Sequence, residues 1–359
     1  MGLGFFDVSD DITSPFANAR VPFPDASFAT RAKNRLAQAT VPGTGLGGLG
    51  SAVAWAARVQ GTDRPTPFLR IDGIVVSGAH FGGFVESTPV DVDVLRALAD
   101  TAGIPLTFIE TEPTGAAESA PLLTVDEYEE ALERGRAAAD AAIDGGADAI
   151  VLIGLGPGVT AAAIGVAAHL TRTPPIELSP RVHVPGGLID DETWMRQTAA
   201  LRDAFARAGG PGRNAAAALS EFGGPVLAIA AAVIVAAAIR RTPVLIDGPA
   251  AAAAALAARD FSLGAPKWCY APDRVPHPVV EKMASQTGMA DPIGPGLDIG
   301  DGCAVLNAVP LLQDALTLAA RLPYPADVDD RDRPDGIVEE EPEDPADDDP
   351  AVTGDGLSH

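Results

Sequence analysis

Ala149-Ile-Val-Leu-Ile-Gly-Leu-Gly-Pro-Gly-Val-Thr-Ala-Ala-Ala163 runs an apolar segment into glycines and then into an alanine-rich segment. The pattern predicts a buried strand, a tight loop and a helix. Gly154, Gly156 and Gly158 allow a sharp turn, and they let backbone N–H groups approach an anion without a Cβ in the way. Thr160 falls in the first helical turn, where its hydroxyl can join those donors. The loop is therefore either an anion site or a tight turn that only packs.

Similar apolar runs stand on both sides of this stretch. Gly73-Ile-Val-Val-Ser-Gly78 and Pro105-Leu-Thr-Phe-Ile-Glu110 precede it, and Pro243-Val-Leu-Ile-Asp247 follows it. Short β-branched runs bounded by Gly or Pro are typical of buried parallel strands. Helices are expected between them, one of them opened by the capping box Thr124-Val-Asp-Glu127. The sequence predicts an α/β fold, a parallel Rossmann-like sheet with helices on both faces.

Four regions are expected along the chain. Residues 1–72 form an N-terminal arm and small helical lobe, irregular over the first forty residues, and residues 73–295 form the α/β nucleotide-binding core. Residues 296–325 hold a closing catalytic signature and a helix that completes the small lobe. Residues 326–359 carry 14 Asp and Glu against two Arg, which is half of the net charge of −24. Such a segment has almost nothing to bury, so we expect a disordered acidic tail.

Composition also bounds the compartment and the partners. No basic stripe is visible, which argues against nucleic acid. The chain begins without a signal-peptide pattern. The most apolar run, Pro225 to Ile239, is only about 15 residues long and is rich in alanine, so it suits a buried helix better than a membrane span. We therefore expect a cytoplasmic protein that contacts neither nucleic acid nor membrane.

Further candidate residues follow the predicted strands. Ligands of open α/β sheets bind at the carboxyl ends of the strands, where His80 and Asp247 are expected. Asp301 lies between two glycines, as a catalytic carboxylate or a helix cap would. Glycine pairs that could also offer backbone amides are Gly186-Gly187 and Gly223-Gly224.

Generic explanations of the central loop differ in strength. A phosphate-binding P-loop needs a Lys after the last glycine, and Val159 stands there instead. Gly156-Pro-Gly-Val-Thr-Ala161 fits the dinucleotide pattern G-x-G-x-x-A, and Glu177 follows about 20 residues on. An NAD(P)-dependent oxidoreductase therefore stays open, although the loop lies in mid-chain. The histidines show no paired spacing that would indicate a metal site.

Taken together, the segments resemble the nicotinate-nucleotide–dimethylbenzimidazole phosphoribosyltransferase (CobT) family over nearly the whole chain except the tail. The family motifs T-K-P-x-G-x-L-G-x-L, V-V-F-A-G-D-H-G-V, G-E-M-G-I-G-N-T-T, G-G-P-E, R-R-x-P-x-L-L-D-G and L-R-L-G-E-G-T-G are similar, in that order, to Thr40 to Leu49, Ile74 to Gly82, Ile153 to Ala161, Gly223 to Val226, Arg240 to Gly248 and Leu297 to Ala304. Collinear matches of this number are far more specific than any one of them.

The resemblance implies an enzyme that transfers the phosphoribosyl group of nicotinate mononucleotide to 5,6-dimethylbenzimidazole or a related base. The product would be alpha-ribazole phosphate, for the lower ligand of cobalamin. It implies Asp301 as the general base, His80 and Leu297 near the incoming base, and neither a cofactor nor a metal. It also implies a homodimer. The substrate-binding set is expected to be completed by Gly154, Gly156, Gly158, Thr160, Gly186, Gly187, Gly223, Gly224 and Asp247.

The chain departs from the family at several of these positions. Gly154 replaces the loop glutamate, Val159 the loop asparagine, Ala79 the aspartate before His80, and Gln197 a lysine; Asp301 replaces a glutamate. Each replacement removes or shortens a polar group. A catalytically degenerate ligand-binding or regulatory protein of the same fold therefore stays open as the alternative.

Overall fold

A parallel sheet of five strands forms the centre of the molecule, in the order β3-β1-β5-β8-β9. The strands are β3 (Leu106–Glu110), β1 (Ile71–Ser77), β5 (Ala149–Leu155), β8 (Val244–Ile246) and β9 (Cys269–Tyr270). This computed structural model describes Phe16 and residues 20–84, 91–184, 188–209 and 214–325. Gly186, Gly187 and the acidic tail expected at 326–359 lie outside the described residues.

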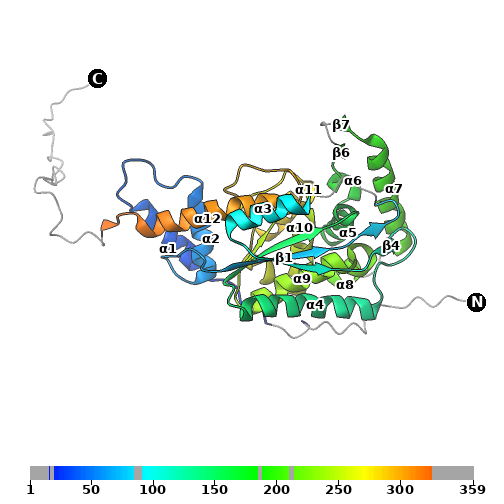
Figure 1. Cartoon of the computed structure of the whole chain (residues 1–359), viewed down its shortest axis with the longest axis horizontal. Helices are drawn as coiled ribbons and strands as arrows, with labels where there is room; N and C mark the ends of the chain where they lie inside the picture. The colour runs from blue at the N-terminus through cyan, green and yellow to red at the C-terminus, as the bar shows by residue number, and fades with distance from the viewer. Residues whose placement is uncertain (1–15, 17–19, 85–90, 185–187, 210–213, 326–359) are drawn as a thin grey trace, which may run out of the picture.

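Helices cover both faces of the sheet, as the sequence predicts (Figure 1). Successive side chains of a strand point to opposite faces, and β5 shows which helices each face meets. Ile153 lies against Gly302, next to α12 (Cys303–Arg321) and near Leu95 of α3 (Val92–Ala102). Gly154 faces the other way, toward α9 (Gly224–Ile239) and α10 (Gly248–Phe261). All of β5 is buried, as expected of a central strand between two helical layers.

The strand order reverses between β1 and β5. The chain passes from β1 outward to β3, then crosses back to β5 on the other side of β1 and continues to β8 and β9. The loops that follow β1 and β5 therefore lead in opposite directions. In open α/β sheets this reversal leaves a crevice at the carboxyl ends of the two strands, where ligands bind.

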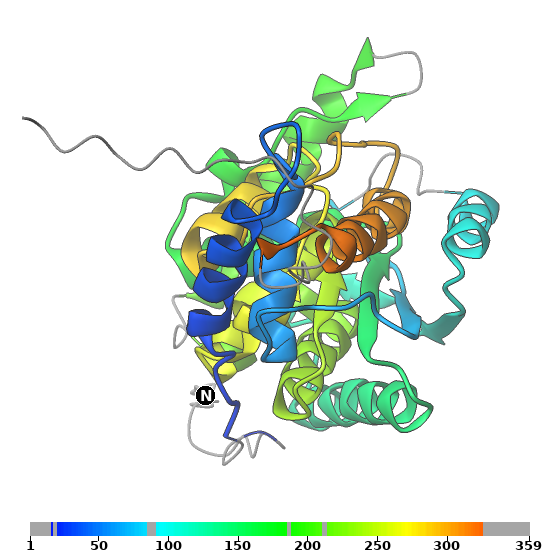
Figure 2. The same cartoon turned by 90° about the vertical axis from the view of Figure 1, so that its left-hand side faces the viewer.

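A small helical lobe stands at one end of the sheet (Figures 1 and 2). It consists of α1 (Ala26–Ala37), α2 (Leu49–Gln60) and α12, with α2 packed on both of the others. The expectation of an irregular segment over the first forty residues is wrong for α1. Asp25 caps this helix, because its carboxylate accepts a hydrogen bond from Ser27 N at 2.8 Å. The helix was hard to recognise because only Ala32 is buried along it.

The remaining elements are short or peripheral. β2 and β4 form a parallel pair, and β6 and β7 an antiparallel pair. Their bounds and those of the other helices are β2 (His80–Phe81), β4 (Thr114–Ala116), β6 (His183–Val184), β7 (Leu188–Ile189), α4 (Val125–Asp144), α5 (Val159–Thr171), α6 (Pro175–Leu178), α7 (Asp191–Ala208), α8 (Ala215–Ala218), a π-helical turn (Leu219–Gly223), a 3₁₀ turn (Ala265–Trp268) and α11 (Pro278–Thr287).

Two described helical segments, Ala215–Ile239 and Cys303–Arg321, are long and apolar enough to cross a bilayer by composition. The first is 89% buried inside the protein over its most apolar window. Helix α9, which holds the run from Pro225, packs between α4 and α10. The apolar run is thus a core helix, as expected.

Asp247 ties the end of β8 to the start of α12. Its Oδ2 accepts from the N–H groups of Gly302 and Ala304 at 2.8 and 3.1 Å, so the side chain satisfies amides that a helix start leaves unpaired. Burial raises the pKa of Asp247 to about 6, and these hydrogen bonds counter only part of that rise. Burial, together with the nearby carboxylates of Asp247 and Asp301, raises the pKa of Cys303 to about 11.

The raised pKa predicts a pH-dependent stability. The folded chain holds a proton on Asp247 that the unfolded chain releases near pH 4, so this stabilisation is full below that pH and is lost as pH rises through about 6. The amide introduced by Asp247→Asn keeps an acceptor but does not titrate. The stability of wild type relative to Asp247→Asn should therefore fall by about 1 kcal/mol between about pH 5 and pH 7.5.

Urea unfolding of both proteins across this range measures the difference. A difference that stays constant with pH contradicts the assignment of the proton to Asp247.

Candidate functional site

The loops after β1 and β5 meet backbone to backbone. Gly156 has φ 134°, and a Cβ there would lie 1.7 Å from the carbonyl oxygen of Gly78. The N–H of Gly78 donates to Leu155 O at 3.1 Å, and the N–H of His80 donates to Pro157 O at 2.8 Å. The two loops are therefore locked together at the point where the strand order reverses.

Gly158 extends the same contact. It caps α5 with φ 80°, and a Cβ would lie 2.6 Å from His80 O and 3.0 Å from Phe84 O. Close packing by the segment after β1 thus explains why Gly is needed at 156 and 158. Gly158 is buried, whereas Gly156 and Thr160 stay partly exposed at the amino end of α5. A helix amino end carries partial positive charge, so these two positions can face an anion.

His80 lies beneath this junction as a neutral side chain. It is 2% exposed, its Nδ1 lies 2.8 Å from Thr114 Oγ1, and its Nε2 is buried without a hydrogen-bond partner among the described residues. Burial lowers its pKa to about 4, so the imidazole is uncharged at neutral pH. It can bind an uncharged ring or hydroxyl, but it cannot supply a cation.

The predicted glycines behind this junction are packed against protein. Gly224 has φ 62° and faces the His80 ring, because a Cβ there would lie 2.4 Å from His80 Cε1. Gly223 is enclosed by side chains of α5, the π-helical turn and α9. At Gly154 a Cβ would lie 2.7 Å from Ala250 Cβ. All three are buried, and they shape the wall of the site.

Asp301 lies at the same sheet edge, beyond the ends of β5 and β8. It is half-buried, and its carboxylate rests on the first residue of α10, where a Cβ on Gly248 would lie 2.4 Å from Asp301 Oδ1. Gly302 beside it packs on Ile153 of β5. Asp247 fixes this segment through the hydrogen bonds of Oδ2 to the start of α12, and its expected contact with substrate stays a prediction. Asp301 and His80 thus flank the end of β5.

Sequence reasoning missed a second carboxylate, which fixes the closing segment, residues 296–302 before α12. Asp273 follows β9 and is 1% exposed. Its Oδ1 accepts from Gly296 N at 2.7 Å and its Oδ2 from Leu297 N at 3.1 Å. Leu297, expected near the incoming base, is placed by these bonds and stays half-buried. Asp273 stands three residues after the end of β9, so its position gave no local signal of the kind that Asp247 gave.

Glu118 is a further missed residue. Its Oε1 accepts from Gly83 N at 2.8 Å, and its Oε2 is buried without a partner among the described residues. Gly82, with φ 92°, packs directly on this carboxylate. Glu118 therefore fixes the segment that continues from His80, and no sequence pattern pointed to it.

The described residues include no group of three His, Cys, Asp or Glu side chains that could hold a metal ion. The edge instead combines the amino end of α5, the neutral His80 and the carboxylate of Asp301. This set suits a ligand with an anionic end and a proton that a carboxylate can accept.

Comparison with known proteins agrees with this arrangement. Residues 21–327 match the family model DBI_PRT, described as phosphoribosyltransferase. The nicotinate-nucleotide–dimethylbenzimidazole phosphoribosyltransferase of Mycobacterium marinum is 30% identical over 329 residues, covering 83% of this chain and 91% of the relative. That of Mycobacterium avium is 32% identical over 333 residues, covering 84% and 93%.

Among solved structures, CobT from Thermus thermophilus superposes with a TM-score of 0.72 at 25% identity, covering 83% of this chain and 97% of that one. The comparisons give no support to the oxidoreductase hypothesis drawn from the G-x-G-x-x-A match. The match over most of the chain, on the fold described above, shows that this protein belongs to the phosphoribosyltransferase family DBI_PRT.

Proposed function

We propose that this chain transfers the phosphoribosyl group of nicotinate mononucleotide to 5,6-dimethylbenzimidazole or a related base, forming alpha-ribazole phosphate for the cobalamin lower ligand. The relatives from Mycobacterium marinum and Mycobacterium avium, which are named for this activity, match along nearly their whole length. The observation that carries the proposal is that the β1 and β5 loops are locked together at the carboxyl ends of the strands, the end of the sheet where Asp301 packs on Gly248 and Gly302 on Ile153 of β5.

Different residues at the carboxyl end of the sheet would bind the two substrates. The phosphate of the nucleotide would lie at the amino end of α5, near Gly156 and Thr160, where the helix dipole favours an anion. The incoming base would lie between His80 and Leu297. A neutral imidazole and a half-buried leucine suit a flat, weakly polar heterocycle.

The chemical step needs one proton acceptor. A ring nitrogen of the base attacks C1′ of the ribose with its lone pair, and the bond from C1′ to nicotinate breaks. The electrons of that bond remain on the nicotinate nitrogen, which loses its positive charge. The N–H proton of the base passes to the Asp301 carboxylate, which acts as general base.

We also propose a cytoplasmic homodimer for the protein in its native setting. The proposal rests on the resemblance to the family, whose members in Mycobacterium marinum and Streptomyces avermitilis are phosphoribosyltransferases by name. The predicted division at residues 72/73, 295/296 and 325/326 likewise stays a prediction.

Removing the general base, the Asp301 carboxylate, should cause a large loss of turnover. Asp301→Asn keeps the size and the packing on Gly248 but accepts no proton, so kcat should fall by about 10² to 10⁴. Nicotinate release and formation of the ribosylated base, followed by chromatography with both substrates present, give the rate. Asp298→Asn is the matched control, because Asp298 is an exposed neighbour in the same segment.

A wild-type chain that gives no product with several benzimidazoles, while it binds nicotinate mononucleotide by calorimetry, would sink the transferase proposal. That outcome supports the degenerate ligand-binding alternative. Unchanged turnover in Asp301→Asn would remove Asp301 as the base.

The replaced loop glutamate gives a second prediction. Because Ala250 Cβ fills the space beside Gly154, Gly154→Glu should cost about 3 kcal/mol of stability through overpacking and a buried charge, and it should not raise turnover. Thermal unfolding measures the cost. Gly48→Glu is the control, since Gly48 is exposed with no atom in the way of a Cβ. Equal stability of the Gly154→Glu variant and wild type would show that the wall at Ala250 gives way.

A further inference from the structure

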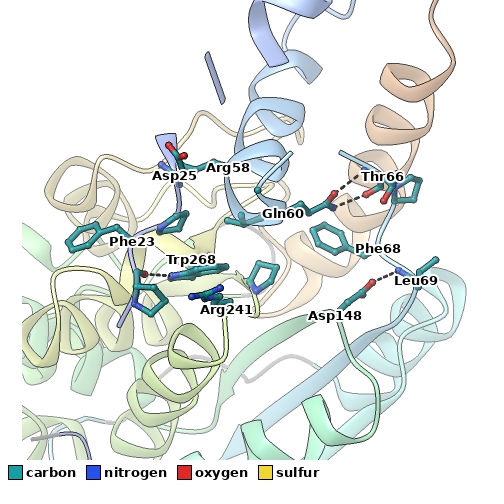
Figure 3. A pocket seen from close by; sticks show the side chains of 16 residues that line it. Phe23, Asp25, Arg58, Gln60, Thr66, Phe68, Leu69, Asp148, Arg241 and Trp268 are labelled. Atoms are coloured by element: carbon teal, nitrogen blue, oxygen red, sulfur yellow. Dashed lines mark hydrogen bonds between the residues drawn. The ribbon is translucent and has the colours of Figure 1, made fainter. Parts of the chain in front are cut away.

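A cavity opens at the end of the sheet opposite the transferase site (Figure 3). Its volume is about 610 Å³, within the range of small-molecule sites. Leu69, Asp148, Pro243 and Trp268 line it, and each lies directly before or near the start of a strand of the main sheet. The cavity therefore lies at the amino ends of the strands, whereas the transferase site lies at their carboxyl ends.

Two arginines in this cavity have unused hydrogen-bonding capacity. Arg58 donates through Nη2 to Lys267 O at 3.0 Å, but its Nε is buried without a partner among the described residues. Arg241 is exposed on the cavity wall, and within the described part of the chain its side chain forms neither a hydrogen bond nor an ion pair. A guanidinium offers five donors, so both side chains can still bind an acceptor.

Among the described residues, the carboxylates on the same wall, Asp25 and Asp148, form no ion pair with these arginines. Asp148 uses both oxygens on the N–H groups of Leu69 and Arg70, at 2.7 and 3.1 Å. Asp25 caps α1 through Ser27. Lys267, whose carbonyl oxygen accepts from Arg58, is a third basic residue beside the cavity, and burial together with the positive charges of Arg58 and Arg259 lowers its pKa. In a chain of net charge −24, such a cluster favours an anionic ligand.

The backbone of Arg241 adds an independent observation. Its φ is 58°, in the left-handed region, at the position after α9 where Gly is the usual residue. A side chain there lowers stability relative to Gly. Arg241 thus holds a costly conformation while its guanidinium lies unpaired on the cavity wall, a combination typical of a functional position.

Aromatic side chains form another part of the lining, beside the polar Gln60 and Thr66. Phe23 is 62% exposed, and Phe68 and Trp268 form further parts of the wall. Trp268 is held in place because its Nε1 donates to Pro22 O at 2.8 Å (Figure 3). We propose that this cavity binds a small organic anion with a flat apolar ring, whose carboxylate or phosphate pairs with Arg58 and Arg241.

Four probes applied to the full chain test this proposal by calorimetry. Phenyl phosphate and benzoate carry ring and charge together, benzyl alcohol carries the ring alone, and inorganic phosphate carries the charge alone. Wild type should bind at least one of the first two about tenfold or more tightly than either single-feature probe. Tighter binding of phenyl phosphate indicates a phosphate ligand, and tighter binding of benzoate indicates a carboxylate ligand.

Arg241→Gly should weaken that binding by about tenfold or more while it raises Tm by about 2 °C, because it relieves the left-handed backbone. Arg172→Gly is the matched control. Arg172 is the other described non-glycine residue with positive φ, 56°, and it ends α5 outside this cavity. The Arg172→Gly variant should gain stability without any change in the binding of the probes. Arg58→Gln should also weaken binding.

Three results overturn the proposal. One is no binding of either anionic ring up to about 10 mM, a concentration at which even weak specific sites fill. Another is equal affinity for the charged and uncharged probes. The third is unchanged binding in Arg241→Gly, which would place the probes at the transferase site instead.

Discussion

The close approach of two backbones, at Gly78 and Gly156, is the constraint on which the candidate site depends. With no Cβ on Gly156, the loop after β1 can reach the loop after β5 and hydrogen-bond to it through the N–H groups of Gly78 and His80. This contact buries His80, and burial makes it neutral. It also holds the amino end of α5 at the carboxyl ends of the strands, the end of the sheet at which Asp301 lies. A side chain at Gly156 would separate the loops and with them the two halves of the site.

The sequence predicted most of the sheet because its strands are short apolar runs with glycines or prolines at their ends. That these strands run parallel follows from the helices that connect them. Helix α1 escaped prediction because its surface is mostly polar, and α10 because a run of alanines after Gly248 has no amphipathic period. Propensity alone would have favoured α10, since alanine is the best helix former.

The site was only partly predictable for a different reason. Asp301, His80 and the glycine loop follow strand ends or stand between glycines, and such positions can be recognised locally. Glu118 and Asp273 act through contacts with Gly83 and Leu297 that depend on the tertiary fold, so no local pattern reveals them. For Asp247 the tertiary fold adds a role that its local position did not suggest. Its position at a strand end suggested a ligand contact, and its carboxylate also caps α12.

The departures from the family share a physical character. Gly154 and Val159 are buried among apolar atoms, and Gln197 is 3% exposed in α7. Each of these positions has lost a charged or polar group of the family motif and is now closely packed, while Asp301 keeps a carboxylate at the carboxyl end of the sheet. The most direct measurement is a crystal structure of the full chain with nicotinate mononucleotide. It should show the phosphate at the amino end of α5 near Gly156 and Thr160, with the ribose C1′ turned toward the space between His80 and Asp301. A nucleotide bound elsewhere, or an Asp301 carboxylate walled off from the ribose, would contradict the assignment of this edge as the transferase site.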